Sequence, residues 1–142
     1  MKLKIKRFDQ SLPLPEYKTD QAAALDLYAR VDTIIGPRKI GYAPLNIALE
    51  LPKDHWALLA ARSSLHKKGL MMANGIGVGD EDFCGDNDEF RAVLFNFTDQ
   101  EVVIKKGERI VQLIILSRKK VEIEGVVELG NNDRGGLGST GF

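Results

Sequence analysis

Short apolar runs separated by turn residues are the feature that most limits how this chain can fold. The runs are rich in Val, Ile, Leu and aromatic residues and recur about every ten residues, which is typical of an all-β sandwich or barrel. Residues such as those at 36–37, 52–54, 98–100 and 106–108 supply turn chemistry between them. The expected strands lie within residues 2–8, 24–29, 46–51, 55–61, 90–97, 101–104, 109–116 and 121–127.

Residues 63–69 are the one stretch with helical character. A serine can serve as N-cap, Lys67 and Lys68 bring basic charge to the last turn, and Gly69 follows it. A segment of this length makes one to two turns and depends on tertiary support. We therefore predict a single short helix in an otherwise all-β domain.

Composition excludes several classes of protein. The 20 Lys and Arg residues balance 20 Asp and Glu residues, which argues against a broad surface for nucleic acid or anionic membrane. One Cys and two His residues cannot form an internal disulfide or a Cys/His metal site. The longest unbroken apolar run, at 56–61, is far shorter than the roughly 20 residues that span a bilayer. The N-terminus also lacks the apolar segment of a signal peptide, so we expect a cytoplasmic protein.

Residues 131–142 form a Gly-rich tail that cannot bury an apolar surface of its own. One interpretation is a frayed terminus, the usual state of such a sequence. The other is a flap that wraps a phosphate group, because glycines let backbone N–H groups approach an anion while Arg, Ser and Thr add donors. Composition alone does not decide between them.

Two further segments contain residues suited to nucleotide chemistry. Residues 61–64 (Ala-Arg-Ser-Ser) end an apolar run and open the short helix, which suits an anion or is simply a capped helix with a surface arginine. In residues 74–85, glycines alternate at Gly75, Gly77 and Gly79, so another strand or a planar ligand packs closely against one face. The acidic residues at 80–82 that follow could activate water or bind a cation, or could form an acidic turn.

Asp26 and Gln112 each interrupt an apolar run. A carboxylate at position 26 either faces solvent or lies partly buried near a cation. Gln112 is either an outward-facing polar residue or a buried amide in a site.

Together these segments resemble the five motifs of the trimeric all-β dUTPase family (deoxyuridine triphosphate nucleotidohydrolases). Each motif is short, but five in the family's order are highly specific. The matching segments are residues 23–27, 61–65, 77–83, 107–113 and 134–141. The resemblance implies a distorted jelly-roll or β-barrel domain at residues 1–130, a flexible flap at 131–142 that closes over a neighbouring subunit's site, and assembly as a homotrimer.

The resemblance also implies a reaction, in which dUTP is hydrolysed to dUMP and pyrophosphate with Mg²⁺. Such an enzyme limits uracil in DNA and supplies dUMP for dTMP synthesis. Asp80 would be the base that activates the water attacking the α-phosphorus, and Asp26 would bind the metal through a water molecule. Phosphate contacts are implied for Arg62, Ser63, Ser64, Gln112, Arg134, Gly138, Ser139 and Thr140.

The implied nucleoside contacts are Asn74, Gly77, Phe83 and Leu137. Asn74 matches the residue that reads uracil, and Phe83 replaces a Tyr whose ring stacks under deoxyribose and leaves no room for a ribose 2′-hydroxyl. Leu137 stands where the family usually has an aromatic residue over the uracil, so we expect weaker nucleotide affinity. Ala24 replaces a usual Gly, and residues 84–89 make a longer connection than usual.

In the family, each site is shared by three chains. Motifs one, two and four would come from one chain, motif three from a second, and the tail from a third. Three alternatives stay open: a dCTP deaminase of the same fold, a non-catalytic nucleotide-binding relative, and a β-sandwich interaction module with accidental motifs. The acidic run at 80–82 followed by Phe83, together with the Gly-Ser-Thr-Gly tail, favours a dUTPase over the deaminase.

Overall fold

The computed structural model describes residues 1–141, and Phe142, the last residue of the expected flap, lies outside them. Within that range the chain is all-β with one short helix, as predicted. The strands are β1 (Lys4–Arg7), β2 (Leu25–Tyr28), β3 (Thr33–Ile35), β4 (Ile40–Pro44), β5 (Ile47–Glu50), β6 (His55–Ala61), β7 (Leu70–Met72), β8 (Gly77–Gly79), β9 (Arg91–Asn96), β10 (Val102–Ile104) and β11 (Arg109–Ser117); the helix is η1 (Leu65–Lys68).

Four antiparallel sheets enclose the core. The largest has the order β2-β11-β6-β8, a second has the order β4-β9-β7, and two pairs, β1-β5 and β10-β3, complete the fold. One row of the largest sheet, made of Leu25, Leu113 and Leu59, is buried and ends at Gly77. The neighbouring row places Asp26 beside Gln112, because side chains alternate between the two faces of a sheet. The register therefore brings these two polar residues, far apart in sequence, to one face.

Most of the predicted apolar runs contain a strand, but one prediction is wrong. Residues 121–127 form no strand, and Ile123 and Val127 are fully or almost fully exposed. A strand needs a hydrogen-bonded neighbour, and this segment pairs with none of the described strands. Strands β3, β4, β7 and β8 lie outside the predicted runs. β3, β7 and β8 have three residues each, and β4 contains Gly41 and Pro44, so their strand signal is weak.

The predicted helix is present in a shorter form. It is 3₁₀ rather than α and begins at Leu65, whose buried side chain fixes it to the core. Ser64 takes the N-cap position without a side-chain cap hydrogen bond, and Gly69 ends the helix at φ +77°, as its sequence position predicted.

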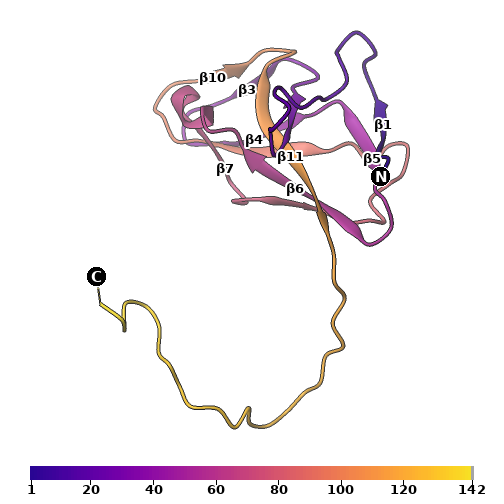
Figure 1. Cartoon of the computed structure of the whole chain (residues 1–142). Helices are drawn as coiled ribbons and strands as arrows, with labels where there is room; N and C mark the ends of the chain where they lie inside the picture. The colour runs from indigo at the N-terminus through magenta and orange to yellow at the C-terminus, as the bar shows by residue number, and fades with distance from the viewer. Residues whose placement is uncertain (142) are drawn as a thin grey trace.

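Beyond β11 the chain leaves the barrel. Figure 1 shows the orange-to-yellow segment running away from the strands in a wide arc. Residues 131–141, the described part of the expected flap, lie in its last part and are exposed. Within residues 1–141, no helix has the length and apolar character needed to cross a membrane.

Candidate active site

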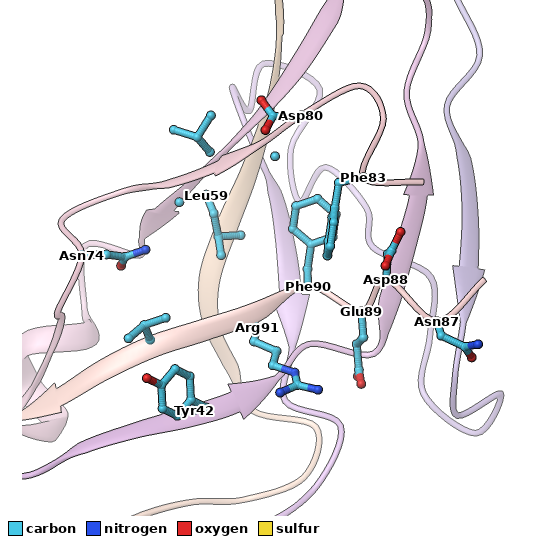
Figure 2. A pocket seen from close by; sticks show the side chains of 14 residues that line it. Tyr42, Leu59, Asn74, Asp80, Phe83, Asn87, Asp88, Glu89, Phe90 and Arg91 are labelled. Carbon is cyan, nitrogen blue, oxygen red and sulfur yellow. The ribbon is translucent and has the colours of Figure 1, made fainter. Parts of the chain in front are cut away.

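A cavity of about 580 Å³ lies between β8, the turn that follows it, and the strands β4 and β9. Four of the predicted site residues line it: Asn74, Gly77, Asp80 and Phe83. Figure 2 shows Asp80 at the rim and the Phe83 ring on the wall of this cavity, with Asn74 at the opposite end of β8. The predicted nucleoside residues of the third motif and the predicted base thus share one hollow.

Two of the three alternating glycines, Gly77 and Gly79, are explained by side chains of this same chain, whereas Gly75 has a φ of +72° and no described residue beyond its chain neighbours within 4 Å of where a Cβ would lie. A Cβ at Gly77 would lie 2.9 Å from Leu59 Cβ, and one at Gly79 would lie 2.7 Å from two ring carbons of Phe90. Any larger residue would therefore displace β8 or its neighbours. Neither glycine has a positive φ, so close packing, not backbone conformation, accounts for them.

The turn that holds Asp80 is fixed by its neighbour Glu81. One oxygen of Glu81 accepts hydrogen bonds from Arg118 Nη2 at 2.7 Å and from the backbone N–H of Asp54 at 3.1 Å. The backbone N–H of Phe83 also donates to the carbonyl of Asp80 at 3.1 Å. The Asp80 carboxylate itself is exposed, so it is free to contact a water molecule or substrate.

The longer connection at residues 84–89 is anchored at its far end. Glu89 accepts hydrogen bonds from Arg30 Nε at 2.7 Å and Nη2 at 3.0 Å, and from the backbone N–H of Asn46 at 3.0 Å. The Glu89 side chain is 7% exposed. This bidentate ion pair holds the chain at the point where it enters β9 and the cavity wall.

Asp26 lies buried among cations, the second of the two alternatives for this residue. Arg62 Nε donates to one of its oxygens at 3.1 Å, and Arg109 Nη1 donates to the other at 2.9 Å. Arg62 also donates to the carbonyl of Arg109 at 2.9 Å, and Gln112 donates to the carbonyl of Ala61 at 2.9 Å. Gln112 is half-buried, which lies between the two alternatives for it, an outward-facing polar residue and a buried amide.

This arrangement fits a magnesium ion held through water. An oxygen that accepts one N–H keeps a second lone pair, so Asp26 can accept a hydrogen bond from a metal-bound water, whereas direct coordination competes with the two arginines. Mg²⁺ commonly keeps several of its waters in protein sites. Across residues 1–141, three or more His, Cys, Asp or Glu side chains nowhere gather into a group that could hold a metal ion.

A second cavity, of about 430 Å³, lies beside this network. Its lining includes Arg62, Ser64 and Arg109, with the two lysines of η1, Lys67 and Lys68. Lys68 is paired with Glu108 at 2.9 Å. The other basic residues of the lining keep the surface net positive, which suits phosphate groups. Ser63 is exposed at the same turn.

The two cavities share no lining residue. A single chain therefore does not bring the predicted base and the predicted phosphate-binding residues into one hollow. The tail residues Arg134, Leu137, Gly138, Ser139 and Thr140 line neither cavity and lie on the extended arm (Figure 1). Leu137 is fully exposed.

Arg109 and Phe90 are site residues that the sequence did not single out. Arg109 stands inside the fourth motif, but its contact with Asp26 depends on the pairing of β2 with β11. Phe90 resembles an ordinary core residue, and its link to the site appears only in the packing against Gly79. The one signal available in the sequence concerned Arg109, a basic residue three positions before Gln112.

Comparison with known proteins places these features in context. The family model described as dUTPase matches residues 10–141. The deoxyuridine 5′-triphosphate nucleotidohydrolase of Hydrogenobaculum is 41% identical over 146 residues, which span 100% of this chain and 99% of the relative. The SPbeta prophage-derived enzyme of the same name from Bacillus subtilis is 38% identical over 143 residues, 99% of each chain.

Solved structures show the same fold. The crystal structure of dUTPase from Streptococcus mutans superposes with a TM-score of 0.76 and 29% identity, covering 83% of this chain and 98% of that one. The Staphylococcus bacteriophage 80alpha dUTPase with dUPNHPP superposes with a TM-score of 0.85 over 99% of both chains. At 21% identity, that second likeness concerns the fold alone.

Proposed function

Because this chain belongs to the dUTPase family and is a dUTP diphosphatase, we propose that Asp80 activates the water that attacks the α-phosphorus of dUTP, releasing dUMP and pyrophosphate. The observation that carries this proposal is the exposed carboxylate of Asp80 at the rim of the cavity that also holds Asn74 and Phe83. A base must lie within hydrogen-bond reach of the proton it removes. At the rim of a nucleoside pocket, such a base would be near both solvent and the first phosphate.

The nucleoside would bind along β8. Uracil presents two carbonyl acceptors around an N3–H donor, and the side-chain amide of Asn74 with nearby backbone groups can complement that edge. Cytosine would instead set an amino donor against donors, which is costly in a closed site. The ring of Phe83 would lie under the sugar and exclude a 2′-hydroxyl by its bulk, a property that needs the ring and not a phenol oxygen.

The phosphate chain would bind at the second cavity. Arg62 and Ser64 line it and would donate there, and Arg109 adds charge beside Asp26. Ser63 and Gln112 do not line it, but Ser63 adjoins Ser64 in the chain and Gln112 is paired with Asp26 in the sheet. Bound magnesium would offset the negative charge that develops on the phosphates. The protein's part is to fix the two arginines through Asp26, so that the donors need little reorganisation during the reaction.

The separation of the two cavities supports a homotrimer with shared sites. An exposed apolar face on the sheet β4-β9-β7 supports the same assembly. Ile40, Tyr42 and Met71 are each more than half exposed. In the register they are paired with Phe95, Val93 and Phe95, respectively. Tyr42 and Val93 also line the first cavity. A second copy covering this face would extend directly into the site and could bring its phosphate-binding residues to Asp80.

The reaction and the base can be tested together. Pyrophosphate release is measured with dUTP, dCTP, dTTP and UTP in the presence of Mg²⁺, for the natural chain, Asp80→Asn and the control Asp86→Asn, which removes one exposed carboxylate in the next turn. We expect turnover of dUTP above the others and a fall in kcat of about a hundredfold or more in Asp80→Asn alone. Equal activity in Asp80→Asn, or ammonia release from dCTP, would overturn the proposal.

The shared site has its own test. Asp80→Asn and Arg134→Ala chains, each inactive by itself, are unfolded together, refolded and assayed. In a mixed trimer some sites receive Asp80 from one chain and Arg134 from another, so activity returns. If each site is built within one chain, mixing restores nothing.

A further inference from the structure

The ring of Phe83 has a specific aromatic neighbour. Its centroid lies 5.3 Å from that of Phe90, and the two rings meet edge to face at 74°. Figure 2 shows the pair on the cavity wall, below Asp80. Phe83 is 39% exposed, whereas Phe90 is 6% exposed. The outer ring faces the cavity and the inner ring supports it.

Phe90 is anchored by its backbone and by the burial of its ring. Its backbone N–H donates to the carbonyl of Ile47 at 2.9 Å, and its carbonyl accepts from the N–H of Leu45 at 2.9 Å. Its ring occupies the space that a Cβ at Gly79 would fill. The Phe90 ring is therefore a rigid platform, because both its backbone and its edge are confined.

Phe83 has no comparable anchor of its own. It belongs to the turn after β8, where its N–H bonds the carbonyl of Asp80, and its side chain carries no polar atom that could fix the ring. An exposed ring held only at its Cα can rotate about χ1 and χ2. The edge-to-face contact with Phe90 restricts that rotation.

We propose that Phe90 is a positioning residue for sugar discrimination: it holds the Phe83 ring in the orientation that excludes a ribose 2′-hydroxyl, so that dUTP is preferred over UTP. This inference rests on the function proposed above, in which Phe83 contacts the sugar. It assigns a specificity role to a buried residue at the back of the same cavity, which acts through the ring of Phe83. Gly79 contributes by leaving room for the platform.

The test compares the ratio of kcat/KM for dUTP to kcat/KM for UTP in four chains: natural, Phe83→Leu, Phe90→Leu and the double variant. Phe90→Leu should lower the ratio about threefold to tenfold, the range expected when one aromatic pair is lost, mainly by raising kcat/KM for UTP. The kcat for dUTP should change little. In the Phe83→Leu background, Phe90→Leu should lower the ratio no further, since Phe90 acts through that ring.

Two more variants separate positioning from general packing. Phe97→Leu makes the same substitution at the residue that follows β9, which does not line the cavity, and should leave the ratio unchanged. Phe90→Met removes about as much volume as Phe90→Leu but can keep a sulfur–aromatic contact with Phe83, so it should retain part of the discrimination lost in Phe90→Leu. If Phe97→Leu lowers the ratio as much as Phe90→Leu, general loosening explains the effect and the inference is wrong.

The outcomes also distinguish this inference from the proposed function. If Phe83→Leu lowers the ratio but Phe90→Leu leaves it unchanged, the ring contact is irrelevant and only the inference fails. If Phe83→Leu leaves the ratio unchanged, the sugar filter itself fails, and the inference fails with it. Additive losses in the double variant would show that Phe90 acts independently of Phe83 and would overturn the proposal as well.

Discussion

Neutralising Glu89 should destabilise the fold far more than neutralising an exposed glutamate. Glu89→Gln keeps the shape of the side chain but presents an amide to the Arg30 guanidinium, which loses its carboxylate partner. Breaking a fully buried ion pair costs about 3–5 kcal/mol. Because the Arg30 side chain is 32% exposed and water can reach it, we expect a loss of about 2–3 kcal/mol in the free energy of unfolding.

Thermal unfolding followed by circular dichroism provides the assay. For a chain of this length the expected loss corresponds to a fall in Tm of about 6–10 °C. Unfolding of an oligomer depends on concentration, so all chains are compared at one protomer concentration. The matched control is Glu50→Gln, whose partner Lys4 forms an ion pair with both side chains well exposed; its Tm should fall by about 2 °C or less. Equal Tm values for the two variants would refute the reasoning.

Three other predictions concern affinity, catalysis and pH. Leu137→Phe should lower the KM for dUTP about threefold to tenfold with little change in kcat, because a ring stacks on a base better than an aliphatic side chain does; steady-state kinetics measure both, and an unchanged KM would contradict this interpretation of position 137. Arg118→Gln should lower kcat about tenfold by releasing Glu81 and with it the turn that carries the base, and combining it with Glu81→Gln should give no further loss. The hydrogen bond from Lys106 is the main cause of the lowered pKa of Asp9, so the stabilisation by that carboxylate should be present above about pH 4 and lost as the pH falls through the folded-state pKa. Urea unfolding should therefore show that the stability difference between the natural chain and Asp9→Asn shrinks from pH 7 to pH 3. A constant difference would contradict the prediction.

Most of the strands could be predicted from the sequence because they depend on local patterns. The alternation of apolar residues and the turn chemistry located most of the sheet. The alternating glycines Gly77 and Gly79 correctly indicated close packing on one face of β8. What packs there, Leu59 and Phe90, depends on which strands become neighbours, and a local pattern does not carry that information.

The surroundings of Asp26 illustrate the same limit. A carboxylate in an apolar run is compatible with a solvent-facing position or with a buried ion pair. The pairing of β2 with β11 decides between them by placing Arg109 beside it, and Arg62 arrives from the end of β6. The failed strand at residues 121–127 shows the reverse case: its apolar residues favour a strand, but strand formation also requires an edge to pair with.

The extended arm that follows β11 has a consequence for newly synthesised protein. Val121, Ile123, Val127 and Leu129 are largely exposed on the extended segment, and an uncovered stretch of β-forming apolar residues invites aggregation and proteolytic cleavage. In the homotrimer proposed above, a protomer that has not yet assembled would leave this segment uncovered, whereas one that packs its arm against its neighbours would cover it. Cellular quality control would then remove orphan subunits selectively, and the abundance of the enzyme would follow the efficiency of its assembly.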